Sequence, residues 1–316
     1  MEKASTHPKP PKISVLIPCY HQAQFLPEAL DSVLRQDFQD LEVIASDDAS
    51  PDNTFSVLQD YSRRDSRIRI FHQPSNLGMV ENWNLCLRQA RGEAVKLMGG
   101  DDRLDRTDCL SRQWQSLQSP GVALAACARK IINQSSDTLK TLVNLSSAVF
   151  SQDKIIPKML EHQDNLIGEP VCCLFRRMDA ARGFNHDYLQ NTDIEMWFHI
   201  LRLGSLAYDP EPLVSFRRHP DQNTNINDKS GLSLKEHRLL ILKQALGDQV
   251  PLATKFHVLS RAEEMLFYGT SQEIREAANV LASHFGLFEM AKQKALHRIQ
   301  QTLRSWNNSL RKRFPR

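Results

Sequence analysis

Short apolar segments and amphipathic segments alternate along the first hundred residues, and this alternation limits the folds open to the chain. The segments at 13–17, 41–46 and 94–98 are mainly apolar, and the segment at 67–72 alternates between polar and apolar residues; all four have the length of strands. Between them, apolar residues recur every three or four positions, which is the spacing of one helical face. Strands that alternate with helices in this way predict an α/β fold, with an open, mostly parallel sheet flanked by helices.

The third of these helices has recognisable boundaries. Gly78 precedes it, and Gly92 stands where a C-cap glycine is expected. Between the two glycines, Val80, Trp83 and Leu87 recur at helical spacing. The sequence therefore predicts a helix that turns these three side chains toward the core and ends at Gly92.

Polar or turn-forming residues follow three of the four predicted strands. The sequence "PCY" at 18–20 follows the first, "DDAS" at 47–50 the second and "GGDD" at 99–102 the fourth. In an open parallel sheet, ligands bind outside the carboxyl ends of the strands, which meet at one edge. We expect the functional site at this edge.

A glycine-rich phosphate loop is absent from the first strand–helix unit. Gly78 is the first glycine of the chain, and no lysine or arginine lies between Lys12 and Arg35. Rossmann and P-loop sites need glycines directly after the first strand, so that the backbone can approach a phosphate. Phosphate bound here would need another counter-charge, and a divalent metal held by carboxylates is the obvious candidate.

Asp101 and Asp102 follow the fourth strand and suit that role. Carboxylates bind hard cations such as Mg²⁺ or Mn²⁺, while phosphate oxygens of a substrate fill other positions on the metal. Gly99 and Gly100 have no Cβ, so a diphosphate could lie close to the backbone. The alternative is a solvated Asp-Asp turn.

Four segments in this order resemble the inverting family-2 glycosyltransferases with the GT-A nucleotide-diphospho-sugar fold. They are "ISVLIPCYHQAQFLPEALDSVLRQ", "EVIASDDASPDNT", "NLG" and "VKLMGGDDRL". The resemblance covers residues 12–225, which we expect to form a GT-A catalytic domain. Residues 1–11 are expected to be a flexible tail, and residues 226–316 a helical C-terminal region.

The resemblance implies roles for individual residues. Pro18 and Tyr20 would line the nucleoside pocket, and Asp48 would hydrogen-bond the nucleobase. Asp101 would face the ribose, while Asp102 would coordinate the metal that bridges the diphosphate.

One departure from the family pattern and one open role concern the same segments. The family often has Asp-x-Asp-Asp where this chain has Gly99 at the first acid. For Asp47, which precedes Asp48, two roles are open: a substrate contact, or a hydrogen bond that ties the turn.

The segment "NTDIEMWFHILRLG" at 191–204 resembles the family's Glu-Asp-x-x-x-Trp helix start, with Thr192 in place of the glutamate. The resemblance makes Asp193 the general base that takes the acceptor's proton. Thr192 and Glu195 also have the spacing of a capping box, and an acid in the first turn is favoured by the helix dipole without any catalysis.

Two further segments resemble parts of the family's site. Residues 168–177 resemble the strand that walls the acceptor side, and residues 216–224 resemble an Arg-x-His loop. The second resemblance implies that Arg218 and His219 reach the diphosphate or the metal. The alternative for His219 is an ordinary histidine of a surface loop.

Charge is concentrated at the C-terminus. Residues 291–316 contain eight Lys/Arg and no Asp/Glu, so the other residues carry a small negative net charge, which argues against a nucleic-acid partner. Apolar residues recur through the segment at helical spacing and predict a basic amphipathic helix. Such a helix could contact an anionic membrane peripherally or pack on the catalytic domain.

These features predict a cytoplasmic, metal-dependent, inverting glycosyltransferase of bacterial cell-surface glycan synthesis. No apolar stretch is long enough to span a membrane, and six scattered cysteines without a C-x-x-C pair indicate a reducing compartment. The partners would be a nucleoside-diphosphate sugar and a glycan or lipid-linked acceptor. Two alternatives remain: a sugar-nucleotide nucleotidyltransferase, and a non-catalytic protein that binds nucleotide sugars.

Overall fold

The computed structural model describes residues 9–162, 165–220, 222 and 232–245, followed by 247, 249–251, 253–255 and 257–258. The chain divides into two units, Met1–Glu236 and His237–Arg316. The fold and site described below belong to the first unit. Most of the expected N-terminal tail and the basic segment 291–316 lie outside the described residues, so the membrane contact expected of that segment stays a prediction.

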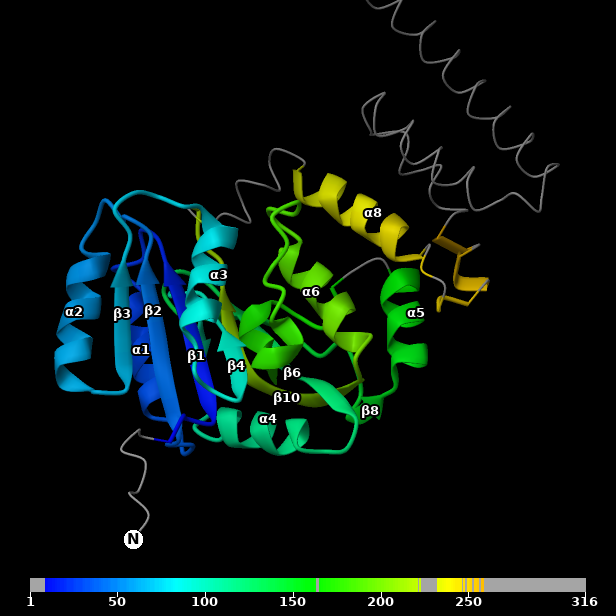
Figure 1. Cartoon of the computed structure of the whole chain (residues 1–316), viewed down its shortest axis with the longest axis horizontal. Coiled ribbons are helices and arrows are strands. Elements are labelled where there is room, and N and C mark those ends of the chain that lie inside the picture. Colours follow the sequence, from blue (N-terminus) through cyan, green and yellow to red (C-terminus); the bar gives the residue numbers. More distant parts are fainter. Residues whose placement is uncertain are drawn as a thin grey trace, which may run out of the picture. The chain divides into compact units, whose positions relative to one another are not determined.

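The first half of the sheet is parallel, as the alternation predicts. Its strands run side by side in the order β3-β2-β1-β4, and all three pairings are parallel. Their bounds are β1 Ile13–Cys19, β2 Leu41–Asp47, β3 Ile68–His72 and β4 Ala94–Leu97. The connecting helices are α1 Leu26–Leu34, α2 Thr54–Arg64 and α3 Met79–Gln89, which flank this half in Figure 1. Every residue of β1, β2 and β4 is buried, which explains why most of their residues are apolar.

The second half of the sheet is mixed and continues the first without a break (Figure 1). Its strand β9 lies antiparallel between β4 and β6, and β10 runs parallel to β6. The strands are β5 Arg103–Leu104, β6 Val122–Ile132, β7 Thr138–Leu142, β8 Ala148–Phe150, β9 Cys173–Arg176 and β10 Ser205–Arg217. The helices are α4 Cys109–Leu117, α5 Gln152–His162, η1 Pro170–Cys172, η2 Arg177–Ala180 and α6 Thr192–Leu201. A further helix, α8 Leu232–Ala245, begins in the first unit and ends in the second. The expected α/β sheet flanked by helices is confirmed.

The boundary predicted at Gly92 is wrong. Helix α3 ends at Gln89, and Ala90 is its C-cap. Gly92 lies instead against β1, where its N–H donates a hydrogen bond of 2.8 Å to the Ser14 hydroxyl. A Cβ at position 92 would stand 2.5 Å from the Ser14 backbone nitrogen. The glycine therefore permits close contact between two backbones and does not cap a helix.

Two simpler properties concern the membrane and the thiols. Across the part of the chain that the structure describes, no helix combines the length and the apolar character needed to cross a membrane. All six cysteines are buried and free.

Candidate active site

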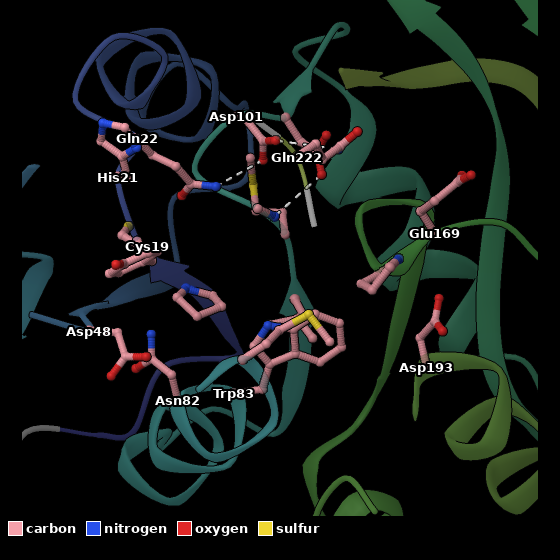
Figure 2. Close-up of a pocket in the computed structure, with 18 of the residues that line it drawn as sticks. Cys19, His21, Gln22, Asp48, Asn82, Trp83, Asp101, Glu169, Asp193 and Gln222 are labelled. Carbon is pink, nitrogen blue, oxygen red and sulfur yellow. Dashed lines mark hydrogen bonds between the residues drawn. The ribbon is translucent and has the colours of Figure 1, made fainter. Parts of the chain in front are cut away.

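A cavity of about 770 Å³ opens at the carboxyl ends of β1, β2 and β4. This is the edge of the sheet where the sequence places the site. Seven of the expected site residues line the cavity: Pro18, Tyr20, Asp48, Asp101, Asp102, Asp193 and His219. Figure 2 shows Asp48 on one side of the cavity, with Glu169 and Asp193 on the opposite side.

Asp48 holds the start of α3. One of its carboxylate oxygens accepts the Leu77 N–H at 2.7 Å, and the other accepts the Gly78 N–H at 3.0 Å. Its own N–H donates to the Cys19 carbonyl at 2.9 Å, which joins the loops after β1 and β2. Burial raises the pKa of Asp48, although the two backbone donors oppose that effect. Each oxygen keeps a second lone pair with which it could accept a hydrogen bond from a ligand.

Asp47 has a different environment from its neighbour. It is fully buried, and one of its oxygens accepts the Ser50 N–H at 3.3 Å and lies 2.9 Å from Nδ1 of His72. The His72 ring in turn stacks on Phe55, with centroids 4.2 Å apart. Asp47 is not among the residues that line the cavity. Its contacts are those of a residue that ties a turn.

The side chain of Asp101 is surrounded by polar groups. Gln22 donates to one oxygen at 3.2 Å, and Gln222 donates to the other at 3.4 Å. Nε2 of His219 lies 3.1 Å from that second oxygen, while the His219 ring packs against Phe25 with centroids 5.0 Å apart. The acid is 6% exposed. Its carboxylate is therefore oriented by side chains from the loops after β1 and β10.

Asp102 is held by backbone groups. It accepts the Arg217 N–H at 3.0 Å and the Gly99 N–H at 3.3 Å. Burial, and after it the charge of the adjacent Asp101, raises the pKa of Asp102 well above its usual range. A cation bound beside the two acids would offset the repulsion between them and favour their charged forms.

Gly99 has a steric role in this arrangement. A Cβ at position 99 would lie 2.3 Å from Oδ1 of Asp101 and 3.3 Å from Oδ2 of Asp102. In this chain the Asp101 carboxylate occupies the space that a side chain at position 99 would need. The observed position of the Asp101 carboxylate therefore requires a residue without a Cβ at position 99.

The two adjacent arginines at the end of β10, Arg217 and Arg218, have different environments. Arg218 is not among the cavity-lining residues, and its guanidinium lies over the Phe216 ring at 5.3 Å. Arg217 is 1% exposed and donates from Nε to the Asp101 carbonyl at 2.7 Å. It also pairs with Glu28 on α1. Arg217, which the sequence reasoning missed, therefore supports the acidic doublet from behind.

Asp193 lies in the first turn of α6, as expected, and is 8% exposed. Burial raises its pKa to about 7, with the nearby charge of Glu169 acting in the same direction. A carboxyl group whose pKa lies close to neutral is well suited to take a proton near that pH.

The capping box expected at Thr192 and Glu195 does not form. The helix begins at Thr192, so the N-cap residue is Asn191, which makes no side-chain cap hydrogen bond. The Thr192 hydroxyl donates to the Asn185 carbonyl at 3.1 Å, and Glu195 forms an ion pair with Arg182 at 2.6 Å. The Glu195 side chain is therefore held by Arg182 and does not cap the helix.

Other cavity residues were not predicted from the sequence. Gln22 belongs to the polar stretch after β1, so its proximity to Asp101 could have been inferred. Glu169 lies between Gly168 and Pro170, a pair that marks a turn but gives no indication of the cavity. Trp83 packs edge-on against Phe184, with centroids 5.3 Å apart, and lines the cavity instead of the core.

The cavity lining is acidic. Among its described residues are five carboxylates: Asp48, Asp101, Asp102, Glu169 and Asp193. The same described lining contains no lysine or arginine. A diphosphate in this cavity would meet several negative charges and would need a cation between them.

The acidic doublet fits a divalent cation. Carboxylate oxygens are the ligands that Mg²⁺ and Mn²⁺ prefer. Within the described residues, no group of three or more His, Cys, Asp or Glu side chains is arranged to hold a metal ion alone. An ion shared with substrate phosphates needs only one or two protein carboxylates, however, and Asp102 with the neighbouring Asp101 supplies these.

Comparisons with known proteins agree with this architecture. An uncharacterised protein of Mycobacterium tuberculosis is 30% identical over 230 residues, which are 68% of this chain and 69% of that protein. A GalNAc(5)-diNAcBac-PP-undecaprenol beta-1,3-glucosyltransferase of Campylobacter jejuni is 43% identical over 95 residues, 30% of this chain and 31% of that enzyme.

A solved structure shares the fold. The mannosyltransferase of Pyrobaculum calidifontis, in complex with GDP-Man and Mn²⁺, superposes with a TM-score of 0.58 and 20% identity. The match covers 95% of this chain and 84% of that one. In sequence, residues 14–184 match the family described as glycosyl transferase family 2. The chain belongs to this family of glycosyltransferases.

Proposed function

We propose that the chain transfers a sugar from a nucleoside-diphosphate sugar to a hydroxyl group, with inversion and with the help of a divalent metal. The observation that carries this proposal is the acidic lining of the cavity, in which Asp102 and Asp193 are both buried. Through a bound cation, such a lining can hold the diphosphate of the donor. Through a carboxylate base, it can take the proton of the acceptor hydroxyl.

The donor would lie across the acidic edge of the sheet. Pro18, Tyr20 and Asp48 would contact the nucleoside, and Asp101 would face the ribose. Asp102 would hold Mn²⁺ or Mg²⁺, which when bound stabilises the negative charge of the departing nucleoside diphosphate. His219, at hydrogen-bond distance from Asp101, would orient that carboxylate or approach the diphosphate.

Asp193 would act as the base. Its carboxylate would accept the proton of the acceptor hydroxyl as that oxygen attacks the anomeric carbon, and the nucleoside diphosphate would leave from the opposite face. A single displacement of this kind inverts the configuration of that carbon.

The acceptor would be a glycan or a lipid-linked glycan of a bacterial cell surface. The name of the Campylobacter jejuni relative describes an undecaprenol-linked acceptor, and another relative, from Bacillus subtilis, is named as a putative enzyme of teichuronic acid biosynthesis. A contact between residues 291–316 and anionic lipid would bring the enzyme to such an acceptor. Pelleting with phosphatidylglycerol vesicles should decrease when residues 291–316 are deleted, and unchanged pelleting would contradict this contact.

One experiment tests the reaction class. The protein is incubated with UDP-, GDP- and dTDP-sugars, with candidate glycan and lipid-linked glycan acceptors, and with Mn²⁺ or Mg²⁺, and the products are separated. Metal-dependent release of nucleoside diphosphate, lost in Asp193→Asn, is the expected result. Pyrophosphate formed from a nucleoside triphosphate and a sugar phosphate would indicate a nucleotidyltransferase instead. Binding of a nucleotide sugar without any turnover would indicate a non-catalytic protein.

A further inference from the structure

The loop from Gly168 to Cys172 is fixed by side chains from three separate elements. Trp197 on α6 donates to the Gly168 carbonyl at 3.3 Å, and Lys96 on β4 donates to the Val171 carbonyl at 2.6 Å. A further donor on α4, Gln113, reaches the Cys172 carbonyl at 2.6 Å. Lys96 is fully buried, and such a group is retained only when it is hydrogen-bonded. The loop is thus a rigid wall of the cavity.

Glu169 projects from this wall. Its side chain is 20% exposed and lines the cavity, whereas its ion-pair partner Arg129 on β6 is 5% exposed and is not a lining residue. The arginine therefore lies behind the acid and presents no positive charge to the cavity. A substrate in the cavity meets the carboxylate.

Glu169 lines the same cavity as Asp102, the proposed metal ligand, and Asp193, the proposed base. Figure 2 shows it beside Asp193 and across the cavity from Asp48. The Glu169 side chain therefore lies in the part of the cavity next to the proposed base and away from the residue proposed to hold the nucleobase. In the proposed function this is the space for the sugar that is transferred.

We propose that Glu169 binds hydroxyl groups of the transferred sugar and restricts the donor to sugars without a negative charge. This inference rests on the proposed function. An ionised carboxylate accepts hydrogen bonds from two neighbouring hydroxyl groups and binds them more strongly than a neutral group would. The carboxylate of a uronic acid in the same space would face Glu169 and Asp193, and the described lining has no lysine or arginine to offset the repulsion.

The test begins with the unmodified protein. Its affinity for matched donors that differ only at C6 is measured calorimetrically with Mn²⁺: UDP-glucose against UDP-glucuronic acid, and GDP-mannose against GDP-mannuronic acid. UDP and GDP serve as references without a sugar. We expect the neutral donor of the preferred nucleotide to bind at least tenfold more tightly than its uronic acid partner. Equal or tighter binding of the uronic acid would overturn the proposal.

Variants then assign the effect to one residue. Glu169→Gln should weaken binding of the neutral nucleotide sugar about tenfold, leave binding of the nucleoside diphosphate within about twofold, and narrow the difference between the paired donors. Glu211→Gln, at an exposed position of β10, is the control and should change none of these values. Unchanged binding of the neutral donor to Glu169→Gln would also overturn the proposal.

The design separates two kinds of failure. If neither UDP, GDP nor any nucleotide sugar binds in the presence of Mn²⁺, the proposed function itself fails. If a nucleoside diphosphate binds but the paired donors are not distinguished, the role of Glu169 alone is wrong. Should Glu169→Gln not fold, because Arg129 has lost its partner, the paired donors with the unmodified protein still decide the question.

Discussion

The carboxylate of Asp102 accepts the backbone N–H of Arg217 at 3.0 Å, although the two residues are 115 positions apart. The same arginine donates from its side chain to the carbonyl of Asp101 at 2.7 Å. One residue at the end of β10 therefore fixes both members of the acidic doublet that follows β4. The placement of the proposed metal ligand depends on this long-range contact.

Replacing Arg217 by lysine should destabilise the protein. The guanidinium also donates to the Asn133 carbonyl at 3.0 Å and pairs with Glu28, and a lysine cannot reproduce these directions. We expect the free energy of unfolding to fall by about 2–4 kcal/mol, because a buried network would be left partly unpaired. Urea denaturation measures this loss. The control is Arg218→Lys, which should change stability by less than about 0.5 kcal/mol; similar losses in both variants would contradict the distinction.

Gly99→Ala should disturb the doublet without unfolding the chain. The added Cβ would stand 2.3 Å from Oδ1 of Asp101, so that carboxylate must move. We expect the affinity for Mn²⁺, measured in the presence of nucleoside diphosphate, to fall about tenfold, while the thermal unfolding midpoint changes little. An unaltered Mn²⁺ affinity would show that the position of the Asp101 carboxylate has no effect on metal binding.

Asp193 should limit activity at low pH. Its pKa is raised to about 7, so the carboxylate that takes the acceptor's proton is mostly neutral at pH 6. We expect the transfer rate to rise as pH passes through about 7, where half of the Asp193 carboxyl groups are ionised, and to level off above about pH 8. Asp193→Asn should lower the rate at least about a thousandfold, within the range for general-base catalysis combined with positioning. A profile that is flat from pH 5 to pH 8 would be inconsistent with this role.

The same substitution should stabilise the fold in alkaline solution. Because the folded-state pKa of Asp193 is raised, the folded protein holds a proton that the unfolded chain releases between about pH 4 and 7. Stability therefore falls as pH rises through this window, and the asparagine removes the cost of the buried charge. At pH 8, Asp193→Asn should raise the free energy of unfolding by about 2 kcal/mol. Glu195→Gln, which breaks the pair with Arg182, is the matched control and should give no gain.

Asp48→Asn should weaken nucleotide binding. The aspartate accepts two backbone N–H groups, from Leu77 and Gly78, one at each oxygen. An amide must turn its NH₂ group toward one of these donors, which leaves that donor unpaired and displaces the loop. We expect the affinity for nucleoside diphosphate to fall at least tenfold in a calorimetric titration. Asp60→Asn on α2, where the acid pairs with Arg63 at the surface, should leave the affinity unchanged.

Sequence reasoning could place the acids that directly follow strands. Asp48, Asp101 and Asp102 come within a few residues of a strand end, and parallel strands bring their carboxyl ends to one edge. Periodicity was sufficient because these strands are short, fully buried and separated by amphipathic helices. Asp193 required the family resemblance, since a first-turn acid alone has an ordinary structural explanation.

Other features depend on packing that the local sequence does not encode. Arg217 and Arg218 are adjacent arginines, the last residue of β10 and the residue after it. Only the direction of each side chain decides which one supports the doublet. Glu169 enters the cavity because distant residues such as Trp197 hold its loop. Gly92 resembles a helix cap by its position, but the close approach of β1 explains it.

The central claim is that Asp102 holds a cation on which the donor diphosphate depends. Calorimetric titration of UDP and GDP into the protein, with Mn²⁺ and after its removal by chelation, tests this claim most directly. The preferred nucleotide should bind only with the metal, and Asp102→Asn should abolish this binding while the fold persists. Equal affinity with and without Mn²⁺, or metal-dependent binding that survives in Asp102→Asn, would contradict the claim.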